Sequence, residues 1–249
     1  MVELAEQRLS QGGLGISFGL EYAPGSSYQE IIALCQVAAR YGKPVAVHTR
    51  TDSWQGLAAI QEVTRFARDT GAAMQISHLV YQVGMGMMTE ALCLIEEAIK
   101  EGLDITVDSG LYSAFATFIG SAVFDPGCLE KWGCDYEDIY VSTGPYAHKR
   151  CDEELFNKLR RDEPDTVVVA FAGKESEVIE AFTKPFVMVS TDGAVGSPEP
   201  GTGHPQDSGT YPKFFRLLVR ETGTLTLLEA VKRCTLLPAQ RLGLKQKGT

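Results

Sequence analysis

One unit recurs along the chain: a short apolar, β-rich run followed by an amphipathic helical pattern. The apolar runs are residues 14–20, 44–50, 73–79, 103–109, 166–173 and 185–193. Their nearly continuous apolar character is typical of strands buried on both faces. Helical patterns occupy 28–41, 55–70, 88–101, 175–183 and 226–233. The alternation predicts an α/β protein with a parallel sheet and right-handed crossovers, and it leaves a doubly wound sheet and a barrel both open.

Two stretches interrupt this rhythm. Residues 111–165 hold aromatic and small residues followed by a polar segment, and residues 193–212 are rich in Gly, Pro and Ser. Long connections in a compact domain are usually functional or mobile. We interpret 111–165 as an insertion over the active face, part lid and part extra helix, within a single domain spanning 1–249.

The composition of the chain argues against several classes of protein. A formal net charge of -9 over 249 residues argues against a non-specific binder of nucleic acid or anionic membranes. No apolar run approaches the roughly 20 residues that a membrane span needs. The six cysteines form no CxxC pair, which favours free thiols in a reducing, cytoplasmic compartment.

Polar side chains stand at the ends of the apolar runs. Glu21, His48 and His78 follow or close the first three runs, Asp108 lies near the end of the fourth, and Asp192 near the end of the last. The carboxyl ends of parallel strands share one rim, where ligands bind in barrels and in open α/β sheets. We therefore expect these side chains to meet.

Two neutral imidazoles and a carboxylate suit Zn²⁺, which lowers the pKa of a water and polarises a carbonyl. His48 and His78 are the candidate ligands, and Asp192 is the candidate general base. Glu21 either contacts the metal, caps a helix or pairs with Arg50. Asp108 is either catalytic or an acceptor for loop amides. Each histidine could also be structural.

Seven stretches in order resemble one known family. They are LGISFGLEYAPG, VAVHTR, QISHL, LDITVDSGLYSA, VMVSTDG, GHPQDSGTYPKF and LTLLEAVKRCTLLPAQRLGL. Together they resemble the N-acyl-D-amino-acid deacylase (D-aminoacylase) branch of the amidohydrolase superfamily, over nearly the whole chain and least between about 120 and 165.

The resemblance implies a partial or distorted (β/α)₈ TIM-type barrel that contains strands four to eight. His48 and His78 then end strands five and six as metal ligands, and Asp192 is the essential acid of strand eight. Glu21 follows strand four, from which some members supply a bridging ligand. The resemblance also implies one or two divalent metals, expected to be zinc, and hydrolysis of a small-molecule C–N amide such as an N-acyl amino acid.

Four residues are expected to contact the substrate. Tyr22, Arg50 and Tyr112 match family positions near the substrate, and His204 lies in a loop that should overhang the same rim.

The chain also departs from the family pattern. It has no His-x-His pair and no early-strand cysteine ligand, so about three N-terminal strands are expected to be missing. Val80 stands where family members tend to have a carboxylate-binding Lys, which leaves the substrate open. An open barrel exposes edges and apolar surface, so we expect self-association.

Three alternatives remain. The first is an amidohydrolase domain that is catalytically inactive and binds metal weakly or not at all. The second is a Ser or Cys hydrolase, although the sequence contains no GxSxG elbow. The third is a phosphate site at Gly84 and Gly86, a pair that lacks the full glycine fingerprint.

Overall fold

The computed structural model describes residues 1–193 and 203–248. Its larger sheet is five-stranded and wholly parallel, in the order β1-β2-β3-β4-β8. The strands are β1 (Ile16–Gly19), β2 (Val45–His48), β3 (Met74–Ile76), β4 (Ile105–Ser109) and β8 (Val187–Val189). Each lies within a predicted apolar run, so the predicted parallel sheet is confirmed. The described strands do not close a barrel, and the fold is a partial one.

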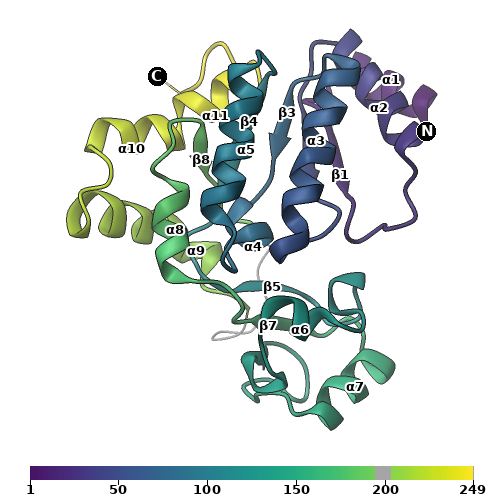
Figure 1. The fold of residues 1–249 in the computed structure, drawn as a ribbon, viewed down its shortest axis with the longest axis vertical. Coiled ribbons are helices and arrows are strands. Elements are labelled where there is room, and N and C mark those ends of the chain that lie inside the picture. Colours follow the sequence, from purple (N-terminus) through teal and green to yellow (C-terminus); the bar gives the residue numbers. More distant parts are fainter. Residues whose placement is uncertain (194–202, 249) are drawn as a thin grey trace.

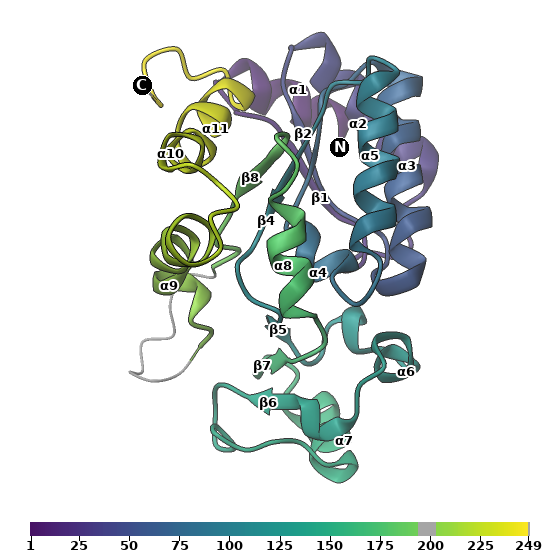
Figure 2. The ribbon, with the colours of Figure 1, turned by 60° about the vertical axis from the view of Figure 1, so that its left-hand side comes forward.

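Helices pack on this sheet (Figures 1 and 2). Those predicted from the sequence are α2 (Tyr28–Arg40), α3 (Gly56–Thr70), α5 (Met88–Lys100), α8 (Glu175–Ala181) and α10 (Leu227–Cys234). Within this set α2 packs on α3, α3 on α5 and α5 on α8, while α10 lies against β8. The remaining helical segments here are α1 (Val2–Ser10), the 3-10 turn η1 (Ser53–Gln55), α4 (Leu79–Val83), α9 (Gln206–Phe214), the π-helical η4 (Phe215–Glu221) and α11 (Leu236–Arg241).

Local signals explain where these helices begin and end. Ser27 caps α2, because its side chain accepts a hydrogen bond from the backbone amide of Glu30. Gly71 ends α3 in the left-handed region, at φ 67°, where glycine avoids the strain of a side chain. The apolar faces of these helices and the strands bury a common core that includes Phe66, Ile60 and Ile76.

A second sheet, antiparallel and in the order β5-β7-β6, forms a small module below the carboxyl ends of the parallel strands (Figure 1). Its strands are β5 (Phe115–Phe118), β6 (Ile139–Val141) and β7 (Val167–Ala170), and its helices α6 (Cys128–Trp132) and α7 (Glu153–Asp162), with the short turns η2 (Ala122–Phe124) and η3 (Tyr136–Asp138). We call residues 115–170 the insertion module. The prediction that 166–173 is a parallel strand of the main sheet is wrong, because β7 pairs antiparallel with β5 and β6.

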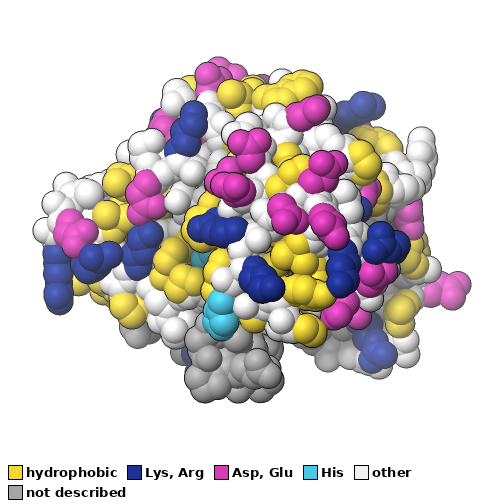
Figure 3. Space-filling model, turned by 90° about the horizontal axis from the view of Figure 1, so that it is seen from below, with side chains coloured by type: hydrophobic (Ala, Val, Ile, Leu, Met, Phe, Trp, Pro, Cys, Tyr) yellow, Lys and Arg dark blue, Asp and Glu magenta, His cyan; other side chains and the backbone are white. Residues whose placement is uncertain are grey.

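The second predicted loop, 193–212, is wrong over the residues that form a helix. Residues 194–202 lie outside the described part, whereas residues from Gln206 onward form α9. No helix among the described residues is long and apolar enough to cross a membrane. All six thiols are free, and the cytoplasmic location stays a prediction. The face seen in Figure 3 mixes acidic and basic side chains.

Candidate metal centre and active site

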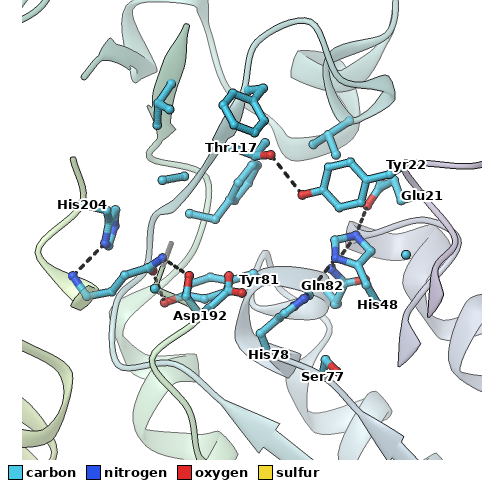
Figure 4. Close-up of a pocket in the computed structure, with 18 of the residues that line it drawn as sticks. Glu21, Tyr22, His48, Ser77, His78, Tyr81, Gln82, Thr117, Asp192 and His204 are labelled. Carbon is cyan, nitrogen blue, oxygen red and sulfur yellow. Dashed lines mark hydrogen bonds and ion pairs between the residues drawn. The ribbon is translucent and has the colours of Figure 1, made fainter. Parts of the chain in front are cut away.

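The two histidines meet at the carboxyl ends of adjacent strands. His48 is the last residue of β2, and His78 follows β3 by two residues. Nδ1 of His48 lies 3.0 Å from Nε2 of His78, with an angle of 66° between the ring planes (Figure 4). The prediction that these side chains converge is thereby confirmed, although their role as ligands stays a prediction.

The histidines lie on a cavity of about 870 Å³, within the usual range for small-molecule sites. The strand ends supply its polar side, with Glu21, His48, His78 and Asp192. The insertion module supplies an apolar wall that includes Phe115, Phe118, Val123 and Val167. The module therefore forms one wall of the cavity over the rim, and the assignment of 111–165 as an insertion within a single domain stays a prediction.

His48 is held from behind by a carboxylate. Its Nε2 lies 3.1 Å from Oε2 of Glu21. Burial, followed by the nearby His78, lowers the pKa of His48 to about 3, so the ring is neutral at physiological pH. The contact is therefore a hydrogen bond that Nε2–H donates to the carboxylate, and it leaves the lone pair of Nδ1 facing His78.

His78 adopts a strained backbone, with φ at 36° in the left-handed region. Its backbone amide donates a 2.7 Å hydrogen bond to Asp108, which also accepts one from Gln75 and one from Ser190. The loop-amide interpretation of Asp108 is confirmed. Nδ1 of the same imidazole is buried and has no hydrogen-bond partner among the residues described.

Asp192 follows β8 and is the third polar group at this rim. It too has a left-handed backbone, at φ 49°, and Gln206 donates a hydrogen bond of 2.6 Å to its carbonyl oxygen. Burial raises the pKa of the Asp192 carboxyl, whereas the nearby His78 and His48 imidazoles lower it. Two of the four non-glycine residues with positive φ in the described ranges are thus site residues, as expected where strain serves function.

The histidine pair fits the nitrogen ligands of a metal. Two nitrogens bound to one tetrahedral zinc stand roughly 3.3 Å apart, since each Zn–N bond is about 2.0–2.1 Å, and the observed separation is 3.0 Å. Neutral imidazole is also the ligating form. Within residues 1–193 and 203–248, however, no three His, Cys, Asp or Glu side chains gather into a complete ligand group.

The predicted substrate-binding residues divide into two pairs. Tyr22 and His204 line the cavity, with the Tyr22 ring 4.8 Å from that of His48. Arg50 and Tyr112 do not line it. Arg50 is instead engaged by both carboxylate oxygens of Glu62 and by two backbone carbonyls, so the structure offers no support for its assigned role.

Tyr112 and His204 contact one another, with ring centroids 5.1 Å apart. Burial lowers the pKa of His204 to about 4, and its Nδ1 accepts a hydrogen bond from the backbone amide of Gln206. Tyr22 donates from its hydroxyl to Thr117 of the insertion module at 3.1 Å. Substrate contact by Tyr22 and His204 stays a prediction.

Sequence reasoning missed a buried polar group behind the histidines. Asp52, Lys131 and Trp132 contact one another there, and Lys131 also reaches Glu21. These residues come from loops and from a one-turn helix, which carry no periodic signal. The amide of Gly86, part of the alternative phosphate site, already donates to Glu177.

Comparison with known proteins gives consistent matches. No family model matches the chain. N-acyl-D-glutamate deacylase and D-aminoacylase, both of Alcaligenes xylosoxydans xylosoxydans, are 29% and 27% identical over the whole chain. Among solved structures, an N-acyl-D-glutamate deacylase of Bordetella bronchiseptica, complexed with zinc and a phosphonate inhibitor, matches 99% of the chain at 28% identity and TM-score 0.83. A D-aminoacylase matches 99% at 25% identity and TM-score 0.85.

The parallel sheet and its rim define a partial barrel of the amidohydrolase type. Within that class, the chain is homologous to the N-acyl-D-glutamate deacylases and D-aminoacylases. It spans about half the length of the curated relatives that it matches, 51% of each of the two above.

Proposed function

We propose that this chain forms part of a metal-dependent amidohydrolase that cleaves the C–N bond of an N-acyl amino acid or a related amide. The observation that carries the proposal is the convergence of Nδ1 of His48 and Nε2 of His78, at 3.0 Å, on the cavity that Asp192 also lines. The zinc bound by the homologous N-acyl-D-glutamate deacylase supports zinc as the metal, with one or two ions in all.

In this proposal His48 and His78 hold the metal. When bound, the metal supplies a Lewis acid that polarises a carbonyl and lowers the pKa of a water. Asp192 accepts the proton of the attacking water and passes it to the leaving nitrogen, while the new C–O bond replaces the C–N bond. Burial raises the pKa of Asp192, which suits a group that must both accept and return a proton.

Glu21 is better placed to orient His48 than to bind the metal itself. Its Oε2 contacts Nε2 of His48, the nitrogen that points away from His78. Carboxylates commonly orient a metal-binding histidine in this manner. We therefore propose that Glu21 orients His48 and does not itself bind the metal.

One observation favours a second candidate, a catalytically inactive domain that binds metal weakly. It is the absence of a complete three-residue ligand group among the described residues. Zinc content by elemental analysis, together with hydrolysis of N-acyl amino acids, separates the two candidates.

The direct test is zinc stoichiometry in wild type, His48→Ala and His78→Ala. Each alanine variant should lose zinc, because it removes one of two converging nitrogens. His148→Ala is the matched control, since this exposed histidine pairs with Tyr140 in the insertion module. Unchanged zinc in both site variants would reject the proposed metal site.

A further inference from the structure

Helix α6 of the insertion module places a lysine behind the metal-site histidines. Nζ of Lys131 pairs with the carboxylate of Asp52 and lies 3.3 Å from Oε1 of Glu21. All three side chains are largely buried, with 17%, 2% and 7% of the side chain exposed. Buried charges are costly unless paired, so this one cation compensates two carboxylates from the partial barrel.

Further contacts fix α6 at this place. The indole of Trp132 donates a 2.7 Å hydrogen bond to the second oxygen of Asp52. The hydroxyl of Ser53 donates to the backbone carbonyl of Lys131, also at 2.7 Å. Ser53 has a positive φ of 54°, so the loop after β2 holds a strained backbone where it meets the module.

The two carboxylate oxygens of Glu21 contact different groups, one in the insertion module and the other on His48. Oε1 faces Lys131 and Oε2 faces Nε2 of His48. When Nε2–H is the donor, this contact favours the tautomer that leaves Nδ1 free to face His78; the side-chain amide of Gln82 lies farther from the same nitrogen, at 3.4 Å. A continuous chain of contacts thus runs from α6 through Glu21 to the imidazole.

We propose that Lys131 is a positioning residue, which holds Glu21 against His48 and so couples docking of the insertion module to the orientation of the first metal-binding imidazole. This inference rests on the proposed function of His48 as a ligand. Without the lysine, the carboxylates of Glu21 and Asp52 repel one another across the space that Nζ fills. Glu21 then turns away, and His48 loses the acceptor that sets its tautomer.

The test compares Lys131→Met with Lys131→Arg, which keeps the charge. Lys158→Met is the matched control, because Lys158 lies in the same module but bonds to Tyr146, away from the site. The first measurement is the His48 tautomer, by NMR of the isotope-labelled ring in metal-free protein. The second is zinc affinity by competition with a chelator.

Wild type and Lys158→Met should both carry the proton on Nε2 of His48. Lys131→Met should lose that preference and bind zinc roughly 10- to 100-fold more weakly, the usual cost of removing a group that supports a ligand. Lys131→Arg should restore both. A Lys131→Met protein that keeps the wild-type tautomer and zinc affinity overturns the inference.

A second variant covers the case in which Lys131→Met does not fold. Glu21→Leu keeps the pair between Lys131 and Asp52 but removes the acceptor that faces Nε2 of His48, so it should also disturb the His48 tautomer; an unchanged tautomer there overturns the inference as well. Because the tautomer is measured without metal, the result stands apart from the zinc-stoichiometry test of the proposed function.

Discussion

The carboxylate of Asp108 accepts the backbone amide of His78 at 2.7 Å and thereby holds a strained residue at the rim of the sheet. The same carboxylate accepts hydrogen bonds from Gln75 and Ser190. One side chain of β4 therefore secures the loops after β3 and β8, which carry the second histidine and the proposed general base.

Asp108→Ala should lower the free energy of unfolding by roughly 1–3 kcal/mol, since it leaves buried donors without an acceptor. Zinc affinity should fall as well, because the backbone of His78 is released. Chemical denaturation and a zinc competition titration measure the two effects, with the exposed Asp162→Ala as control. Unchanged zinc affinity in a destabilised Asp108→Ala protein would show that the contact serves folding alone.

Asp192→Asn should keep the metal and lose turnover, because the amide cannot accept the proton of the attacking water. General acid–base groups contribute about 10²- to 10⁴-fold to a rate, and a fall in kcat of that size is expected. Zinc content and initial rates on N-acyl amino acids are the measurements. Joint loss of zinc and activity would instead identify Asp192 as chiefly a ligand.

His204 should make the fold sensitive to acid. Its pKa of about 4 in the folded state lies below the ordinary value of 6.5, so between these pH values the unfolded chain binds more protons. Stability from this group is complete above pH 6.5 and is lost as the pH falls toward 4, by up to about 3 kcal/mol. His204→Asn, which retains an acceptor for Gln206, should lack this loss. Parallel pH profiles of unfolding for both proteins would contradict the assignment.

In the metal-free protein, the cavity should discriminate against anionic ligands. Glu21, Asp52, Asp192 and Asp207 line it, and within the described ranges no Lys or Arg does. Near a protein surface, a like-charge contact costs on the order of a few kcal/mol, so N-acetylleucinamide should bind the metal-free protein roughly tenfold or more tightly than N-acetylleucine. Calorimetry with this pair provides the test, and tighter binding of the acid would count against it.

Self-association is expected from two exposed features. β1 and β8 each have one strand neighbour in the described sheet, and Leu227 and Leu228 of α10 are 62% and 79% exposed. Light scattering should report a species larger than the monomer, and Leu228→Lys should shift it toward the monomer. A wild-type monomer at high protein concentration would contradict the expectation.

Much of the fold follows from the sequence, because apolar runs and helical periodicity directly report burial. The run that became β7 shows the limit of this reasoning. Residues 166–173 look like a buried parallel strand, yet β7 pairs within the antiparallel sheet of the insertion module, and its Val168 and Ala170 are buried in the hydrophobic core common to both sheets. Periodicity reports that a strand is buried but not which sheet it joins.

The convergence of His48, His78 and Asp192 on one cavity was predictable, because these residues stand at or just after the carboxyl ends of strands. The site was not predictable where partners lie far apart in sequence. Arg50 is held by Glu62, and Lys131 reaches Glu21 across 110 residues. Such contacts depend on how the module docks, and no local pattern encodes them.

The insertion module also lies in the sequence between β4 and β8, two strands that pair with one another in the main sheet. Ser109 of β4 pairs with Val189 of β8, whereas Ile16 of β1 pairs with Val45 of the very next strand. Contacts between distant segments form late, because the chain loses entropy on closing a long loop before the contacts that stabilise it can form. We therefore expect the first four strands to assemble early and β8 to join last, so that Asp192 reaches the histidines only in the final stage of folding.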